Sequence, residues 1–517
     1  MSFGLLAFCT AFVASAIIAP IVARIATRWG IVDAPDAHRK VHKNAVPLTG
    51  GPTIIASSIV AFATTLYVFP DLLKPTPHDA KFLLALLISA CIIVAIGIID
   101  DRFGMRGRQK LAGQILAALV LLPSGIVVRE ISVMGYQISF GDLGPIVTLM
   151  CIVGAINALN LIDGVDGLAS TTGIILSLSI AAVTFVYGGR PDGLLTSLIL
   201  AGTLSGFLLY NFPPARMFLG DSGSMLIGLI LGAVALKCSV KQFAAATLVM
   251  PTAIWAIPLF DVAMAIVRRK LTGRSIYETD RGHLHHCLER KGLGGAKLLG
   301  ITASLCAMTG LGAVIASIMQ NDLIALIGVG TALSLLVLTR SFGHTEMSLL
   351  SNRVRRLVGS MVHRRAPVQT VLHDQKMRLN GDHDWEKAWE TLTDFAERFE
   401  MDSVELIVNL PRIGEEYHAS WKRKTETQTH EAWKSEIPLI VDEMRVGQIK
   451  VVGAVGEGSI CKWMSDLIGG LEAFEAELVT LISDLRVRKQ VARPAKADDH
   501  KSLPTPVADV VTTRALG

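Results

Sequence analysis

The chain has 517 residues, of which 51% are hydrophobic, with a mean hydropathy of +0.49 and a net charge of +5. A soluble protein of this length would be less apolar, so the composition argues against one and predicts a polytopic membrane protein. The charge is too mild to indicate nucleic-acid binding by itself, and we expect no nucleic-acid partner. The seven cysteines include no C-x-x-C pair, so we interpret them as small buried side chains, neither disulfides nor zinc ligands.

Long apolar segments fill the first 340 residues. A membrane-spanning helix needs about 20 apolar residues, and eleven segments qualify, although several are short or interrupted by Gly and Pro. They are residues 3–27, 50–69, 81–99, 110–128, 144–160, 171–188, 194–210, 223–237, 243–267, 297–318 and 322–339. The chain begins without a basic region, and Arg24 and Arg28 follow the first apolar run. This favours an uncleaved first span with the N-terminus outside.

The loops between these spans differ in charge. With the N-terminus outside, loops 28–49, 100–110, 160–170, 211–222 and 268–296 lie inside and hold 16 Lys and Arg, against 5 in the outside loops. This asymmetry satisfies the positive-inside rule. We therefore predict an all-α, multi-pass protein of the inner (plasma) membrane, with about eleven transmembrane helices and a cytoplasmic C-terminus.

The first inside loop is dense in cations, with Arg39, Lys40 and Lys43, and ends at a tight turn, Gly50-Gly51. Two interpretations stay open for this loop. The cations either anchor it at the cytoplasmic face or form a phosphate-binding strip, because Lys and Arg donors suit phosphate oxygens. The second interpretation makes Lys43 a substrate-binding residue.

Two adjacent acids, Asp100 and Asp101, lie where the third span leaves the membrane, and Arg106, Arg108 and Lys110 follow them. Carboxylates at a helix C-terminus oppose the helix dipole, so capping of their own helix does not explain them. The pair fits either a salt-bridged surface turn or a Mg²⁺ and phosphate site.

The most specific stretch runs from Asn157 to Leu168. Asn157, Asn160 and Asp163 are spaced at i, i+3 and i+6, which places them near one face of a helix. Gly164 then allows the chain to leave the helix and approach a ligand closely. Such a polar stripe, followed by Asp166, is hard to explain as packing within a membrane span and predicts a functional site.

A second exposed acid, Asp221, is bracketed by glycines after the seventh span, in the stretch that begins at Asn211 and Pro213-Pro214. It is either the N-cap of the eighth span or a site residue. Phe218, three residues earlier, is placed where a planar base could stack on it.

Three histidines, His283, His285 and His286, close the set beside Arg and Lys. Few further ligands lie near them, so binding of a diphosphate or orientation of an acid is favoured over zinc. Asp261, within the ninth predicted span, could by itself be a buried polar contact. The sequence has no Walker A, G-x-G-x-x-G or G-x-S-x-G element, which argues against an ATP-driven pump, a Rossmann enzyme and a lipid esterase.

Taken in order, these motifs resemble those of the polyprenyl-phosphate N-acetylhexosamine-1-phosphate transferases (glycosyltransferase family 4), over about residues 1–340. The resemblance implies that undecaprenyl phosphate attacks the β-phosphorus of a UDP-N-acetylhexosamine, that UMP leaves, and that Mg²⁺ (or Mn²⁺) is required. The residue chemistry agrees, because an anionic phosphate approaching a diphosphate demands charge neutralisation. Direct attack in one step is favoured, since a phosphate is already a competent nucleophile.

The resemblance also implies three groups of site residues on the cytoplasmic face. The catalytic group, which includes the acid pair near the lipid phosphate, is Asp100, Asp101 and Asp163. The Mg²⁺ ligands are Asn160 and Asp221. The contacts to the nucleobase, the diphosphate and the metal–diphosphate region are Asn211, Phe218, Asp166, His283, His285 and His286.

The histidine motif gives some indication of the sugar, because its His-x-His-His form resembles that of the superfamily members that transfer GlcNAc-1-phosphate. We therefore expect GlcNAc-1-phosphate transfer that initiates a cell-surface polysaccharide, such as O-antigen. Phospho-MurNAc-pentapeptide or 6-deoxy-amino-sugar transfer is the alternative within the superfamily. A non-catalytic transporter or scaffold is the alternative from another class, although a transporter should place its ionisable residues near the bilayer midplane.

The remaining chain reads as a basic linker at 341–370, a cytoplasmic α+β domain at 371–490 and a disordered tail at 491–517. Apolar residues at spacings of three and four predict a helix over 384–401. Strands are predicted at 404–410, 437–441 and 448–452, the last two paired, and a long helix at 460–487. Sensing of a ligand, recruitment of a glycosyltransferase and homodimerisation stay open as roles for this domain.

Overall fold

The computed structural model describes residues 2–33, 45–73, 77–133, 136–187, 191–242, 246–247, 249–271, 282–344, 347, 373–380, 385–399, 401–410, 415–423, 432–441, 444–454, 479–480 and 482. The chain divides into two units, Met1–Val358 and Gly359–Gly517. The predicted cationic loop with Lys43, nearly all of the linker, and the tail lie outside the described residues.

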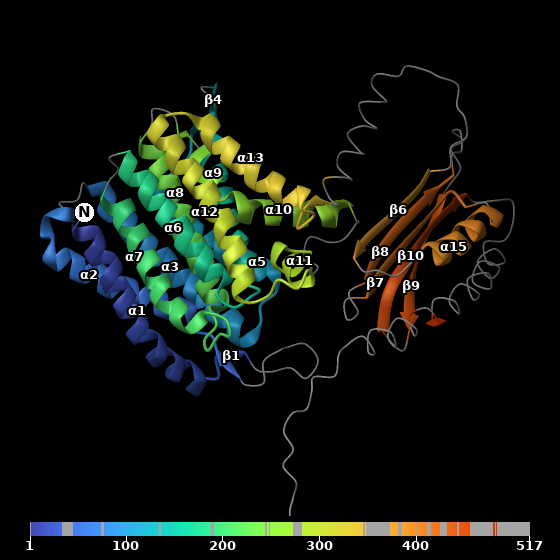
Figure 1. Cartoon of the computed structure of the whole chain (residues 1–517), viewed down its shortest axis with the longest axis horizontal. Helices are drawn as coiled ribbons and strands as arrows, with labels where there is room; N and C mark the ends of the chain where they lie inside the picture. The colour runs from blue at the N-terminus through green and yellow to red at the C-terminus, as the bar shows by residue number, and fades with distance from the viewer. Residues whose placement is uncertain are drawn as a thin grey trace, which may run out of the picture. The chain divides into compact units, whose positions relative to one another are not determined.

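The first unit is a bundle of helices (Figure 1). Its helices are α1 (Ser2–Arg28), α2 (Gly50–Val68), α3 (Pro77–Phe103), α4 (Gly107–Leu121), α5 (Gly144–Ile162), α6 (Leu168–Val186), α7 (Pro191–Asn211), α8 (Gly220–Gln242), α9 (Val249–Ile254), α10 (Ala256–Leu271), α11 (Leu284–Arg290), α12 (Ala296–Met319) and α13 (Asp322–Leu338). Short strands pair β1 (Val32–Asp33) with β2 (Val46–Pro47), and β3 (Glu130–Val133) with both β4 (Tyr136–Ser139) and β5 (Ala246–Thr247).

Eight of the described helices are long and apolar enough to cross a membrane, namely α1, α2, α3, α5, α6, α7, α8 and α12. A polytopic α-helical membrane protein is therefore confirmed. The predicted number of eleven spans and the orientation of the chain stay predictions, because α4 and α13 have only 15 and 17 residues.

The ninth predicted segment, 243–267, is not one continuous helix. Residues 246–247 form strand β5, and the helical part is divided between α9 and α10 at Trp255. Pro258 has no N–H to donate to the carbonyl of Ile254, four residues earlier, so the hydrogen-bond ladder is interrupted at this point. That this segment crosses the membrane stays a prediction.

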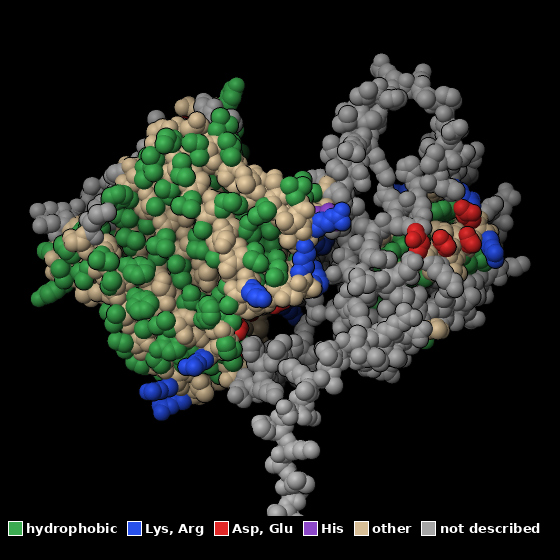
Figure 2. All heavy atoms as spheres, viewed as in Figure 1, with side chains coloured by type: hydrophobic (Ala, Val, Ile, Leu, Met, Phe, Trp, Pro, Cys, Tyr) green, Lys and Arg blue, Asp and Glu red, His purple; other side chains and the backbone are tan. Residues whose placement is uncertain are grey.

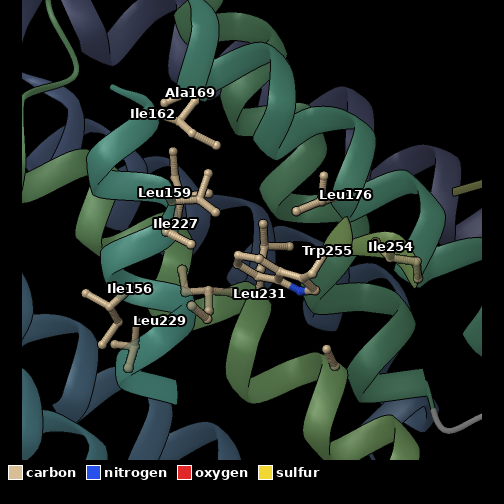
Figure 3. Close-up of a cluster of buried hydrophobic side chains, with 14 of the residues drawn as sticks. Ile156, Leu159, Ile162, Ala169, Leu176, Ile227, Leu229, Leu231, Ile254 and Trp255 are labelled. Atoms are coloured by element: carbon tan, nitrogen blue, oxygen red, sulfur yellow. The ribbon is translucent and has the colours of Figure 1, made fainter. Parts of the chain in front are cut away.

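Helix α8 is the central helix of the bundle. Of the residues in its most apolar stretch, 89% are buried inside the protein, against 28% for α1. Side chains of α5, α6 and α9 pack against those of α8. Trp255, which follows α9, lies among Leu231, Ile227 and Leu176 (Figure 3). Hydrophobic side chains cover the outer face over α1, α7, α6 and α12, whereas Lys and Arg gather at the edges near the end of α1 and near α10 and α11 (Figure 2). This distribution is that of a helix bundle surrounded by lipid.

The end of α3 lies directly against the beginning of α8, and a glycine makes this approach possible. A Cβ added at Gly97 would lie 2.2 Å from the Cα of Ser222, which is backbone and cannot rotate away. Because Asp100 and Asp101 follow Gly97 by one turn, the contact sets the position of the acid pair relative to Asp221.

The second unit is an antiparallel five-stranded sheet with the strand order β6-β8-β7-β10-β9. The strands are β6 (His373–Asn380), β7 (Ser403–Leu410), β8 (Glu415–Lys422), β9 (Ala432–Val441) and β10 (Met444–Ala454), and helix α15 spans Glu386–Arg398. Trp385, Trp389 and Leu392 of the helical segment are buried with side chains of the sheet. The predicted helix at 384–401, the strand at 404–410 and the pairing of the last two strands are confirmed, while β6 and β8 were not predicted. The predicted helix at 460–487 lies almost entirely outside the described residues.

We expect that Gly97→Ala lowers both the melting temperature and the activity, because the added methyl group forces α3 and α8 apart at a cost of about 1–3 kcal/mol. The matched control is Gly154→Ala in α5, where a Cβ would meet no atom within 4 Å. Unfolding in detergent, followed by intrinsic fluorescence, measures both variants. Equal melting temperatures for the two variants would contradict this description of the α3–α8 contact.

Candidate active site

A pocket of about 320 Å³ opens where several helices of the first unit end. Its walls come from strand β1, the residues before α2, the turn between α5 and α6, the end of α7 and the segment before α8. The lining residues are Asp33, Leu48, Asp163, Gly164, Val165, Asp166, Asn211, Phe218, Leu219 and Gly220. Four of the predicted site residues therefore line one cavity, although they lie far apart in the sequence.

Beside this pocket, an ammonium group joins two of the predicted acids. The Nζ of Lys110, in the first turn of α4, lies 3.0 Å from Asp100 Oδ2 and 2.8 Å from Asp221 Oδ2. The amide of Asn160, at the end of α5, donates to Asp221 Oδ1 and to Ser224 Oγ. Helices α3, α4, α5 and α8 thus bring their polar ends together at one point, which we call the Lys110 cluster (Asp100, Lys110, Asn160 and Asp221).

Asp101 has a different environment from Asp100. Its two carboxylate oxygens accept hydrogen bonds from the backbone N–H groups of Asp221 and Ser222, at 2.8 and 3.2 Å. These amides belong to the first turn of α8, where a negative charge is stabilised by the helix dipole. Asp101 therefore caps a neighbouring helix, a role that its position at the end of its own helix did not predict.

Asp163 and Asp166 flank the turn between α5 and α6. Enclosure by protein raises the pKa of the Asp163 carboxyl well above its ordinary value, and the negative charges of Asp221 and Asp101 raise it further. Asp166 Oδ2 accepts a hydrogen bond from the backbone N–H of Ala215 at 2.9 Å, which ties this turn to the segment before α8. Asp163 therefore faces the pocket with a raised pKa, and Asp166 fixes the turn by its hydrogen bond to Ala215.

Asn211 ends α7 and Phe218 lies two residues before α8, and both line the pocket. The Asn211 side chain is buried and engaged at both ends, accepting from Ser170 Oγ at 2.8 Å and donating to the Met217 carbonyl at 2.9 Å. The backbone of Phe218 bonds to Pro47 and Thr49, while its side chain is only half-buried at the pocket wall. Of the two, Phe218 is the better placed for a nucleobase contact, which stays a prediction.

The three histidines at the start of α11 have different hydrogen-bond partners, although the ring of His285 lies beside those of His283 and His286, with centroids 5.9 and 4.2 Å apart. His283 Nδ1 lies 3.0 Å from Asp261 Oδ2, and Asp261 Oδ1 also accepts from the N–H of Leu284 at 2.8 Å. His285 is buried against Gly164, and burial lowers its pKa to about 4, so the ring is neutral near pH 7. His286 is more exposed and bonds to Glu289, whose pKa this bond lowers.

The family profile of glycosyl transferase family 4 matches residues 83–239, which span α3 to α8 and hold the whole Lys110 cluster. A protein of Bacillus subtilis, named a probable undecaprenyl-phosphate N-acetylglucosaminyl 1-phosphate transferase, is 34% identical over 289 residues, or 56% of this chain and 77% of that protein. The chain belongs to glycosyl transferase family 4. This family is the superfamily of polyprenyl-phosphate sugar-1-phosphate transferases that the motifs resemble.

Other relatives within the family have similar names. The decaprenyl-phosphate N-acetylglucosaminephosphotransferase of Mycobacterium tuberculosis is 35% identical over 295 residues, 52% of this chain and 71% of that protein. The undecaprenyl-phosphate alpha-N-acetylglucosaminyl 1-phosphate transferase of Escherichia coli is 28% identical over 304 residues, 56% of this chain and 78% of that protein.

The structure of this family member adds residues that sequence reasoning missed. Lys110 was named only as one of three cations beside the acid pair and was not among the predicted site residues, yet it lies at the centre of the site. Gln114 follows it by one turn of α4 and exchanges hydrogen bonds with Asn157. The spacing of four between Lys110 and Gln114 was the available signal, because it places both on one face of α4. Asp261, which the sequence analysis named as a possible buried polar contact, is buried and bonds to His283.

The donor set at the Lys110 cluster fits a magnesium ion. Asp221 offers a carboxylate, and the Asn160 amide, whose N–H donates to Asp221, would offer its oxygen after rotation of the amide group. Asp100, Asp101 and Asp163 lie around them, and Lys110 bonds to Asp100 and Asp221. No group of three or more His, Cys, Asp or Glu is preassembled as a metal cage among the described residues. Mg²⁺ is bound in many enzymes by one or two carboxylates plus water and substrate phosphates, so this donor set is sufficient.

We expect that Asp101→Ala lowers the free energy of unfolding by about 1 kcal/mol, because two amides of α8 lose their acceptor. Asp101→Asn keeps one acceptor oxygen and should recover part of that loss without the charge. Asp100→Ala is the matched comparison, since its carboxylate bonds to Met105 N, to Lys110 and to the side chain of Asp221 but accepts from neither of these two α8 amides. Melting curves in detergent compare the three variants; a larger stability loss for Asp101→Asn than for Asp101→Ala would contradict the capping role.

Proposed function

We propose that this protein transfers N-acetylglucosamine-1-phosphate from UDP-N-acetylglucosamine to undecaprenyl phosphate and releases UMP. The lipid-linked sugar would form at the cytoplasmic face of the inner membrane and start a cell-surface polysaccharide. The observation that carries the proposal is the Lys110 cluster, which gathers oppositely charged side chains beside a pocket at the membrane-helix ends. The names of the relatives support the choice of acceptor and sugar.

The reaction brings a phosphate against a diphosphate, so the site must neutralise several negative charges. The side chains of Asp221 and Asn160 would hold Mg²⁺, which when bound neutralises the diphosphate and the leaving UMP. Lys110 adds an ammonium group whose three donors suit phosphate oxygens. Its bonds to Asp100 and Asp221 hold that ammonium group in place before substrate arrives.

The two adjacent acids would then have separable roles. Asp100 orients Lys110. It lies near the C-terminal end of α3, where the phosphate of the attacking lipid would enter the site. Asp101 fixes the first turn of α8 and therefore the direction of Asp221. Neither acid is needed as a base for a phosphate nucleophile that is already ionised, which favours direct attack on the β-phosphorus in one step.

The pocket volume lies in the range of small-molecule sites, and its wall combines an aromatic ring with acids and a glycine. Phe218 would stack on the uracil ring, and Gly164 would let the diphosphate approach the backbone. Asp163, whose pKa is raised by its surroundings, faces this part of the pocket and would be stabilised as a carboxylate when Mg²⁺ arrives.

Transfer of phospho-MurNAc-pentapeptide or of a 6-deoxy-amino sugar differs from this proposal only in the donor. A transporter would be expected to place its acids near the bilayer midplane. Here Asp100, Asp163 and Asp221 lie at helix ends, which favours an enzyme.

The direct test measures UMP release by the purified protein with undecaprenyl phosphate and a panel of UDP-GlcNAc, UDP-GalNAc and UDP-MurNAc-pentapeptide. We expect release with UDP-GlcNAc that EDTA abolishes and Mg²⁺ or Mn²⁺ restores. Asp221→Ala and Lys110→Gln should lower kcat by about a hundredfold or more, since each removes charge stabilisation of the transition state. The matched control is Arg108→Gln, on the same turn as Lys110.

Release with another donor alone would replace UDP-GlcNAc by that donor. Failure with every donor in an expanded panel, by protein that is folded, would contradict the transferase proposal.

A further inference from the structure

A small cavity of about 10 Å³ lies behind the histidines, between α6, α10, α11 and α12. Its polar lining residues are Thr172, Asp261, His285 and Thr302. The remaining lining residues are Ile162, Leu168, Ile257, Leu284 and Cys306. The volume is close to that of one water molecule, and a water is stable in such a place only when it has two to four polar partners.

Two of the lining residues carry hydroxyl groups whose hydrogen bonds are not satisfied by protein. Thr172 and Thr302 are 1% and 3% exposed, and neither hydroxyl has a hydrogen-bond partner in the described part of the chain. Some other buried hydroxyls on the same two helices bond to their own preceding turn, as Ser177 does to Gly173 at 2.6 Å and Thr309 to Cys306 at 3.0 Å, whereas Thr171 on α6 also has no partner among the described residues. A buried hydroxyl without a partner is costly, so two of them beside one water-sized cavity indicate a shared polar occupant.

His285 lies between this cavity and Gly164, and it does not itself line the larger pocket. It lines the small cavity, and its Nε2 would lie 2.5 Å from a Cβ at Gly164, which is a wall residue of the larger pocket. The nitrogen that remains for the small cavity is Nδ1. Because burial keeps the ring neutral near pH 7, one ring nitrogen must be a donor and the other an acceptor.

We propose that one ordered water molecule occupies this cavity, accepts hydrogen bonds from Thr172 and Thr302, and donates to Nδ1 of His285. Its second proton would be donated to the carboxylate of Asp261, whose oxygens also bind His283 and Leu284. All four hydrogen bonds of the water are then made. The proton of the imidazole then lies on Nε2, which lies against Gly164 in the wall of the larger pocket.

This inference makes Thr172 and Thr302 positioning residues that act through His285. Its catalytic consequence rests on the proposed function, because the acceptor of the Nε2 proton would be an oxygen of the UDP-sugar diphosphate. The water site itself depends only on the two hydroxyls, the cavity and the histidine.

The test replaces the hydroxyls without changing the side-chain volume. We expect Thr172→Val and Thr302→Val each to lower kcat for UMP release by about tenfold, with the KM for UDP-GlcNAc changed by less than about twofold. The kcat of the double variant should be about the same as that of either single variant, because both hydroxyls hold one water. Thr172→Ser and Thr302→Ser should restore activity, and Thr309→Val, whose hydroxyl bonds within its own helix, is the matched control.

A second readout does not depend on turnover. The full chain, labelled with ¹⁵N-histidine in nanodiscs and compared with His285→Ala for assignment, should give a single Nε2–H tautomer for His285. The double Val variant should give a mixture of tautomers. If the wild-type protein releases no UMP, the proposed function fails, and the tautomer of His285 still decides the water site.

Two results would overturn the inference. One is an unchanged His285 tautomer in the double Val variant. The other is a loss of activity from Thr172→Val that is the same size in a His285→Ala background, since that would show a structural effect that does not pass through the histidine.

Discussion

The site depends on one shared ammonium group. Lys110 lies between the carboxylates of Asp100 and Asp221 with little exposure to solvent, so each ion pair is stronger than it would be in water. Removal of one partner would leave a charge uncompensated in a protected place. The ammonium group therefore joins α3, α4 and α8 electrostatically, and the remaining acids are arranged around that junction.

The junction is held by backbone geometry as well as by charge. Gly97 lets α3 approach the first turn of α8, and Asp101 then accepts hydrogen bonds from two amides of that turn. These contacts fix Asp221, and Asn160 of α5 bonds to it from the other side. Because α8 is the most buried of the spanning helices, the packing of the whole bundle positions this single carboxylate.

Much of this arrangement could be predicted from the sequence, because acids are rare at the ends of apolar helices and their spacing is informative. Asp100, Asp163 and Asp221 were predicted as site residues because they are such acids, and Asn160 because of its spacing from Asn157 and Asp163. The sequence did not indicate that Asp101 caps α8, since that bond joins residues 120 positions apart. The sequence placed Lys110 beside the acid pair together with Arg106 and Arg108, but it could not show which of the three cations bonds to the acids. Strand β6 was missed because six of its eight residues are polar, whereas the alternation of buried Tyr417, Ala419 and Trp421 in β8 was an available signal.

The measurement that tests the central claim most directly is the position of a divalent cation. A crystal grown with UDP-GlcNAc and Mn²⁺ in place of Mg²⁺ locates the ion by its anomalous scattering. We expect one peak in contact with Asp221 and Asn160, beside the diphosphate, and no peak in Asp221→Ala. A peak bound by other residues, or an unchanged peak in that variant, would contradict the assignment of the Lys110 cluster as the catalytic centre.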